Sequence, residues 1–244
     1  MKGVILAGGT GSRLYPLTKV TNKHLLPVGR YPMIYHVLYK LLEIDVREIL
    51  IVTGKEHIGH MVALLGSGRD IGAGITYRVQ DEAGGVAHAL ALAEDFARSE
   101  RLVVVLGDNV FEDSLKPFAN HYGSQGKGAR VLLKEVPDAA RFGVAVVDKE
   151  RVVRIDEKPH RPLSSYAVTG IYFYDSQVFD IISELVPSAR GELEITDVNN
   201  IYIEKRELEF DMLKGWWTDA GTYPSYCRAN HLARNIELGV ESLR

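Results

Sequence analysis

Three features are scarce in this sequence, and each scarcity excludes a class of protein. One cysteine, Cys227, among 244 residues excludes an internal disulfide and a cysteine-built zinc site, and is typical of a reducing compartment. A formal net charge of −3 provides no overall basic field for nucleic acid or an anionic membrane. No apolar run approaches membrane-spanning length, and the first residues lack a signal-peptide pattern. We expect a cytoplasmic protein that binds neither nucleic acid nor membrane.

What is present is the composition of an ordinary globular protein. Hydrophobic residues make up 46% of the chain and charged residues 25%. A chain of 244 residues can bury a large core as one α/β domain. No linker, repeat or low-complexity tract divides it, so we predict a single domain over residues 1–244.

Strand and helix patterns alternate over the first 110 residues. Such alternation favours a parallel sheet with helices on both faces. Ligands bind to these sheets beyond the carboxyl ends of the strands. We predict strands at 4–7, 48–53, 72–79 and 102–106 and helices at 32–44, 58–65 and 86–96.

From about residue 130 the pattern changes to successive strands joined by short turns. This predicts an antiparallel or mixed extension of the same sheet, so the whole sheet is mixed but mostly parallel. The predicted strands are 130–136, 143–147, 152–156, 166–174 and 207–213, and the predicted helices are 177–185, 195–205 and 222–238.

The first strand ends in a glycine-rich loop. Gly8, Gly9 and Gly11 allow positive φ angles and a close approach of the backbone to a ligand. Consecutive backbone N–H groups in such a loop can bind phosphate. Two cations follow, Arg13 and Lys23, so a polyphosphate is the predicted ligand. The alternative is a glycine turn that merely connects a strand to a helix.

Two common phosphate-binding motifs do not fit this loop. The mononucleotide P-loop ends in Gly-Lys-Ser/Thr, whereas this loop ends in Gly11-Ser12-Arg13. The dinucleotide motif requires a third glycine where this chain has Leu14.

Two aspartates are candidate metal ligands. Asp108 directly follows the predicted strand 102–106, and Asp219 lies in Trp216-Trp217-Thr-Asp-Ala-Gly. Magnesium typically takes one or two carboxylates together with substrate phosphates and water. Considered singly, an aspartate in such a position is more often a turn or cap residue than a metal ligand. Lys158, which precedes Pro159, is likewise explained by a solvated turn.

Several motifs together resemble those of the sugar-nucleotide pyrophosphorylases, most closely the members that make dTDP-glucose. The resemblance extends from Met1 to about residue 235. The matching stretches are 6–16, 23–27, 106–109, 157–159, 166–175, 188–197 and 217–222.

The resemblance implies a three-layer αβα, Rossmann-like nucleotidyltransferase fold. It also implies condensation of dTTP and glucose 1-phosphate to dTDP-glucose and pyrophosphate, the first step of dTDP-rhamnose or related deoxysugar synthesis. Residues 1–110 would bind the nucleotide and residues 111–244 the sugar phosphate. Mg²⁺ would be held by Asp108 and Asp219, and Arg13, Lys23 and Lys158 would act on the phosphates.

The remaining site residues are also carried over from the resemblance. The residues predicted to contact the nucleotide are Leu6, Gly8, Gly9, Gly11, Gln80, Gly85 and Asp108. The residues predicted to contact the sugar phosphate are Gly143, Glu157, Lys158, Val168 and Arg190.

The chain also departs from the family pattern. His24 and Phe142 replace the usual glutamine and tyrosine, and residues 81–84 lack the common proline. Longer members add C-terminal helices that help to build a second, regulatory nucleotide site and a subunit interface. The resemblance therefore leaves that site open for this chain, and we expect a monomer or dimer rather than the family's tetramer. Another base (UTP or CTP) or sugar phosphate, a glycosyltransferase and a non-catalytic relative remain alternatives.

Overall fold

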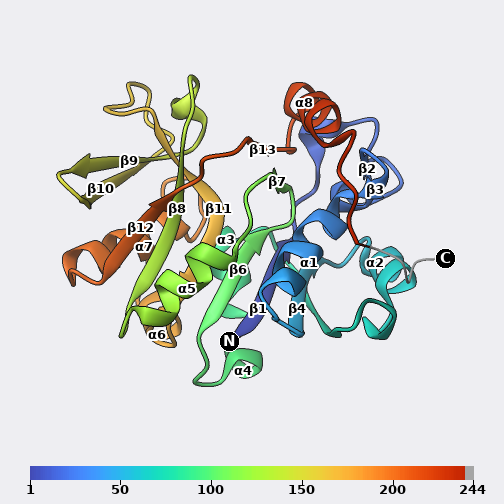
Figure 1. Cartoon of the computed structure of the whole chain (residues 1–244), viewed down its shortest axis with the longest axis horizontal. Helices are drawn as coiled ribbons and strands as arrows, with labels where there is room; N and C mark the ends of the chain where they lie inside the picture. Colours follow the sequence, from blue (N-terminus) through green and yellow to red (C-terminus); the bar gives the residue numbers. More distant parts are fainter. Residues whose placement is uncertain (240–244) are drawn as a thin grey trace.

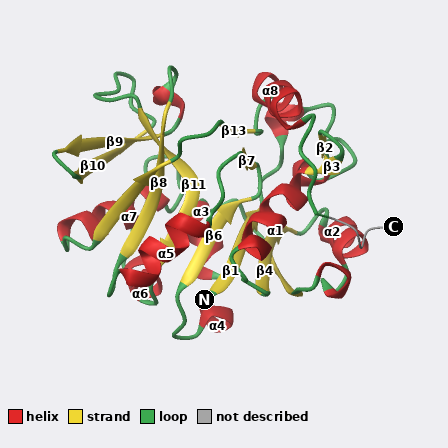
Figure 2. Ribbon diagram, viewed as in Figure 1, coloured by secondary structure: helices red, strands yellow, loops and turns green. Residues whose placement is uncertain are grey.

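The computed structural model of the chain describes residues 1–239 and is organised around one mixed sheet (Figure 1). Helices lie on both sides of this sheet, which gives the three-layer αβα architecture (Figure 2). The strands of the sheet are β1 (Lys2–Ala7), β4 (Glu48–Gly54), β5 (Gly74–Gln80), β6 (Leu102–Leu106), β8 (Ala129–Glu135), β9 (Gly143–Asp148), β10 (Arg151–Glu157), β11 (Tyr166–Tyr174) and β12 (Leu208–Met212).

The four N-terminal strands of the sheet run parallel. β1 lies between β4 and β6, and β5 pairs with β4 at the edge. Their carboxyl ends therefore meet at one edge of the sheet, where a ligand can contact several strands. The helices that connect or follow these strands are α1 (Met33–Glu43), α2 (Ile58–Leu65), α3 (Val86–Ala91) and α4 (Glu94–Ala97).

Alternation of side chains along the strands produces two cores, one on each face of the sheet. Val4 and Leu6 belong to one core, whereas Ile5 and Ala7 belong to the other. Successive side chains of a strand point to opposite faces, so an unbroken apolar strand requires helices on both sides. Within the described residues, the C-terminal part supplies α5 (Lys116–Ser124), α6 (Gln177–Ser183), α7 (Ile195–Glu204) and α8 (Tyr223–Ala233).

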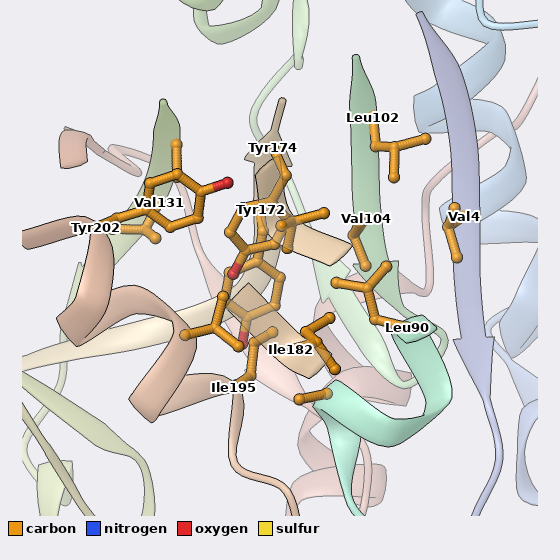
Figure 3. Close-up of a cluster of buried hydrophobic side chains, with 14 of the residues drawn as sticks. Val4, Leu90, Leu102, Val104, Val131, Tyr172, Tyr174, Ile182, Ile195 and Tyr202 are labelled. Carbon is orange, nitrogen blue, oxygen red and sulfur yellow. The ribbon is translucent and has the colours of Figure 1, made fainter. Parts of the chain in front are cut away.

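β11 joins the parallel part of the sheet to the C-terminal part. It pairs antiparallel with β6, β8 and β9, and β12 continues the sheet parallel to β8. Its side chains Tyr172 and Tyr174 stack at 5.8 Å between ring centroids, and Tyr174 stacks on Tyr202 of α7 at the same distance (Figure 3).

A separate two-stranded ribbon begins just beyond the carboxyl end of β6. It consists of β7 (Asn109–Phe111) and β13 (Trp217–Asp219), with Asp219 paired opposite Asn109. The pairing brings Asp219 close to Asp108, although the two acids are far apart in the sequence. Two further short strands, β2 (Pro27–Val28) and β3 (Tyr31–Pro32), pair with one another.

The predicted helix 86–96 is divided in the structure. The N–H of Ala93 donates to the carbonyl of Leu90, three residues earlier, which interrupts the α-helical pattern between α3 and α4. The final helix was predicted to reach residue 238, but α8 ends at Ala233. The chain turns there, and the N–H of Ile236 donates to the Ala233 carbonyl.

The sequence did not predict α5, β7 or β13. Helix α5 buries only Phe118 and Tyr122, so its apolar stripe is too narrow to indicate a helix. The two strands have three residues each and depend on pairing with one another. No helix within residues 1–239 is long and apolar enough to cross a membrane. The two-part division of the domain, the cytoplasmic location and the oligomeric state stay predictions.

Asn109 fastens the ribbon to the sheet. Its buried side-chain oxygen accepts hydrogen bonds from Trp217 Nε1 at 2.7 Å and from the Gly170 N–H at 3.0 Å. Asn109→Ala leaves both buried donors unpaired, and each costs about 1–3 kcal/mol. We expect the free energy of unfolding to fall by about 2–4 kcal/mol in denaturant titrations. The exposed Asn120→Ala is the control, and equal stabilities would contradict this role.

Candidate active site

A cleft of about 390 Å³ opens at the carboxyl ends of β1, β5 and β6. It is lined by the end of β1, by the glycine-rich loop and by residues of the C-terminal half. Every site residue predicted from the sequence lines this cleft except Gly11 and Arg190. The fold therefore gathers in one cavity residues that lie far apart along the chain.

One of the three predicted catalytic cations, Arg13, and the two predicted metal ligands converge at Gly221. A Cβ atom on this glycine would lie 3.2 Å from Asp108 Oδ2, 3.3 Å from Arg13 Nη2 and 3.6 Å from Asp219 Oδ2. Two acidic groups and one guanidinium thus surround a single point left open by the missing side chain. Such a group of oxygens suits a divalent cation in contact with phosphates.

Lys23 and Asp108 form a short ion pair. Lys23 Nζ donates to Asp108 Oδ2 at 2.6 Å, and both side chains are largely buried. Burial alone would raise the pKa of Asp108, but the charge of the Lys23 ammonium, the neighbouring His24 and the hydrogen bonds from Lys23 and Asn109 hold that pKa below its usual range. Asp108 is therefore ionised over the whole working range of pH.

Asp219 is held in a different way. Arg141 Nη2 donates to its two carboxylate oxygens at 3.2 and 3.3 Å, and Arg141 Nη1 donates to Asp138 at 2.8 Å. Burial and the Asp108 carboxylate raise the pKa of Asp219 to about 6, although Arg141 opposes the rise. In the protein without ligands, each acid is therefore paired with a cation.

The glycine-rich loop has the positive φ angles expected of it. Gly9 has φ 91° and Gly11 has φ 63°. A Cβ atom on Gly11 would lie 2.8 Å from Thr18 and 3.4 Å from Lys23 Cβ, so this glycine allows the loop to pack on the segment that carries Lys23. Gly11 thus positions a cation of the cleft without lining it.

The far end of the cleft is built around Glu157. Its carboxylate accepts from Thr196 Oγ1 at 2.6 Å and pairs with Lys158 Nζ at 3.1 Å and with Arg190 Nη2 at 3.2 Å. Burial raises the pKa of Glu157, but the hydrogen bond from Thr196 and the two cations lower it further, so the net shift is downward. Arg190 therefore acts on the cleft through Glu157.

Lys158 has φ 42°, a left-handed conformation unusual for a residue other than glycine. Its N–H donates to the Phe142 carbonyl at 3.0 Å, which ties this strained position to the segment before Gly143. The backbone thereby directs Lys158 from the end of β10 to the cleft wall.

Gly85 has a structural task in addition to lining the cleft. It has φ 98°, and a Cβ atom there would lie 2.5 Å from the Leu193 carbonyl oxygen. The Leu193 N–H donates to the Gly84 carbonyl at 2.8 Å. The two glycines therefore hold the 188–194 segment against the start of α3.

Comparison with known proteins agrees with this geometry. A family model described as nucleotidyl transferase matches residues 2–235. The chain belongs to this family.

Similar proteins indicate which kind of nucleotidyltransferase this chain is. A glucose-1-phosphate thymidylyltransferase of Neisseria meningitidis is 42% identical over 241 residues, which are 97% of this chain and 84% of that protein. One from Xanthomonas campestris is also 42% identical, over 97% of this chain and 82% of that protein. This nucleotidyltransferase is thus an enzyme that acts on a sugar phosphate.

Solved structures agree with the fold. One from Bacillus anthracis, provisionally assigned as a glucose-1-phosphate thymidylyltransferase and solved with a sucrose, is 61% identical with a TM-score of 0.94, covering 97% of this chain and 96% of that chain. A UDP-glucose pyrophosphorylase with UDP-glucose is 25% identical with a TM-score of 0.84, covering 95% of this chain and 97% of that chain. The predicted resemblance, fold class and enzyme class are confirmed.

Sequence reasoning missed several residues that line the cleft of this nucleotidyltransferase. Arg141 is the main one, because it contacts Asp219 and yet precedes the cleft residues 142 and 143 in a short exposed turn. Its only sequence signal was its position directly before Phe142, which stands where the family usually has tyrosine. Other missed lining residues are Asn109, Tyr172 and Trp217.

The raised pKa of Asp219 has a measurable consequence for stability. An acid whose pKa rises on folding destabilises the folded protein wherever it is ionised. Asp219→Asn should therefore raise the free energy of unfolding near pH 7.5 by about 2 kcal/mol, after allowance for the lost Arg141 contact. The gain should disappear as the pH falls from about 6 to about 4, since the parent carboxyl becomes protonated.

Denaturant titrations at the two pH values measure this difference. The exposed Asp148→Asn is the matched control and should show no such pH-dependent gain. A loss of stability in Asp219→Asn near pH 7.5 would contradict the assignment of Asp219 as a destabilising buried acid.

Proposed function

We propose that this enzyme condenses dTTP and α-D-glucose 1-phosphate to dTDP-glucose and pyrophosphate. The observation that carries the proposal is the convergence of Arg13, Asp108 and Asp219 around Gly221. This point lies in one cleft, and cationic side chains line the cleft at each of its two ends. The names of the relatives at 42% identity supply the base and the sugar. The product would enter dTDP-rhamnose or related deoxysugar synthesis.

The nucleotide would occupy the end of the cleft formed by the glycine-rich loop. Backbone N–H groups and positive φ angles at Gly9 and Gly11 favour a bound triphosphate. Arg13 and Lys23 would neutralise its oxygens, and Gln80 and Gly85 would contact the base. Leu6, Gly8 and Asp108 complete this end of the cleft.

The sugar phosphate would occupy the other end. Glu157 is a buried carboxylate that can accept hydrogen bonds from sugar hydroxyls, and Gly143 and Val168 line the same wall. Lys158, held in its left-handed conformation, would bind the phosphate. Arg190 would hold Glu157 in place through the 3.2 Å contact.

The residues around Gly221 fit a bound Mg²⁺. Two carboxylates and the absence of a Cβ atom leave space for a hard cation that prefers oxygen ligands. Asp108 and Asp219 would hold the ion. Lys23 and Arg141, which pair with these two carboxylates in the structure, would then become available to bind phosphate. When bound, Mg²⁺ would supply neutralisation of phosphate charge.

The reaction would require positioning rather than proton transfer. An ionised phosphate oxygen of glucose 1-phosphate would attack the α-phosphorus in line, and the bond from this phosphorus to the β-phosphate oxygen would break. The electron pair would leave with pyrophosphate, so no general base is needed. Arg13 would stabilise the charge that develops on the transferring and leaving phosphates.

Turnover tests this proposal directly. With Mg²⁺, dTTP and glucose 1-phosphate, the pure protein should release pyrophosphate. A higher rate with UTP or CTP, or with another hexose 1-phosphate, would replace the named substrates but keep the reaction class. Absence of release with every tested pair would contradict the proposal.

Arg13→Ala should lower kcat/KM by about a hundred- to a thousandfold, because a charge contact in the transition state is lost. The exposed position of Arg13 predicts little change in melting temperature. The exposed Arg69→Ala is the control and should keep parental turnover. If Arg13→Ala melted at a much lower temperature, the loop would be structural rather than catalytic.

Gly221→Ala tests the metal site without changing a charge. Its Cβ atom would enter the space between Asp108, Asp219 and Arg13, so we expect Mn²⁺ affinity, measured by paramagnetic resonance, to fall at least about tenfold. Gly123→Ala is the control, since a Cβ atom there meets nothing within 4 Å. Equal Mn²⁺ affinity in both variants would contradict a metal site at this position.

A further inference from the structure

The amide of Gln80 is held in one orientation by two acceptors. Gln80 is 9% exposed at the end of β5, and its Nε2 donates to the Gly85 carbonyl at 3.3 Å. The same nitrogen lies 3.1 Å from Nδ1 of His88. An amide nitrogen carries two hydrogens, so these two acceptors use its whole donor capacity.

The oxygen of the same amide remains available to a ligand. Gln80 lines both the main cleft and an adjoining cavity of about 110 Å³. Its Oε1 lies 2.9 Å from where a Cβ atom on Gly8 would be, at the cleft wall. Among residues 1–239 no hydrogen-bond donor is placed on Oε1. Gln80 thus offers the cleft an acceptor and no donor.

His88 reaches Gln80 because Gly84 has no side chain. A Cβ atom on Gly84 would overlap the His88 ring, which extends from α3 across this glycine. With Nε2 of Gln80 donating to the Gly85 carbonyl, Nδ1 of His88 accepts from the same nitrogen in the tautomer whose ring proton resides on Nε2 of the histidine. The segment 81–84, which departs from the family pattern, therefore has room for this contact.

The reverse orientation of the amide is unfavourable. It would place Oε1 of Gln80 against the Gly85 carbonyl oxygen, which accepts hydrogen bonds and cannot donate one, and it would require His88 to carry its ring proton on Nδ1. Buried acceptors without donors are costly. His88 and Gly85 together therefore fix which atom of Gln80 faces a bound base.

We propose that His88 is a positioning residue for base selection. By holding the Gln80 amide with its oxygen toward the cleft, it selects bases with a ring N–H, thymine and uracil, over cytosine, whose ring nitrogen is itself an acceptor. Where this oxygen faces the ring nitrogen, thymine and uracil can donate to it, whereas cytosine carries no hydrogen at that nitrogen and is disfavoured. This inference rests on the proposed binding of a nucleotide base at Gln80.

Substitution of His88 tests the inference through selectivity. The measured quantity is the ratio of kcat/KM for dTTP to that for dCTP, with glucose 1-phosphate as the acceptor. His88→Leu removes the acceptor and should lower this ratio about tenfold, the value of one hydrogen bond. His88→Asn restores an acceptor at the position of Nδ1 and should return the ratio to within about threefold of the parent.

His231→Leu is the matched control, an exposed histidine of α8, and should leave the ratio unchanged. A purely structural role for His88 would lower both rates together and keep their ratio. An unchanged ratio in His88→Leu, or a parent enzyme with no preference for dTTP over dCTP, would overturn the inference.

A second measurement needs neither turnover nor nucleotide. In the ligand-free protein, ¹⁵N NMR of the histidine rings should show His88 with unprotonated Nδ1 and protonated Nε2. The opposite tautomer would place a donor toward Gln80 and overturn the inference, even if the enzyme releases pyrophosphate. Absence of pyrophosphate release together with the expected tautomer would instead locate the failure in the proposed function.

Discussion

Charge pairing at the carboxyl ends of the strands is the interaction on which this enzyme depends. Asp108 is held by Lys23 at 2.6 Å, and Asp219 is held by Arg141 at 3.2 Å. Without such partners, two carboxylates this close together would repel one another in a largely buried site. The pairing offsets part of the cost of burying the two acids, and in the proposed reaction the same cations would be available to the phosphates of the substrates.

The fold brings these charges together through backbone features rather than through neighbouring residues in sequence. Asp108 sits where β6 ends, and the β7–β13 ribbon brings Asp219 beside it. Asn109 fastens the ribbon, Gly11 lets the first loop pack beside Lys23, and Gly221 leaves the space between the acids open. Asn109 stabilises the ribbon, whereas the buried acids that the ribbon brings together cost stability, which is usual where a protein positions charged groups for function.

Much of the fold could be predicted from the sequence because its strands are short, apolar and separated by clear helical patterns. Val4 to Ala7 and Leu102 to Leu106 could be recognised in this way, since both faces of the sheet are covered. The ribbon could not, because β7 and β13 are stabilised by long-range pairing and not by local pattern. Helix α5 was missed because it buries too few residues to show a period.

The residues of the site likewise differ in whether a local sequence pattern could indicate them. Glycines and cations near the first strand have local signals, whereas the partnership of Asp108 with Asp219 came only from the family resemblance. Arg141 and His88 had no signal of their own, since each acts through another side chain, Asp219 or Gln80. Contacts of this kind are set by tertiary structure, so one sequence cannot indicate them.

The most direct test of the central claim is anomalous X-ray diffraction from crystals grown with Mn²⁺ and dTTP. The account predicts a manganese peak within coordination distance of both Asp108 and Asp219, with the guanidinium of Arg13 on the triphosphate. A manganese peak elsewhere, with Lys23 and Arg141 still on the two carboxylates, would contradict it.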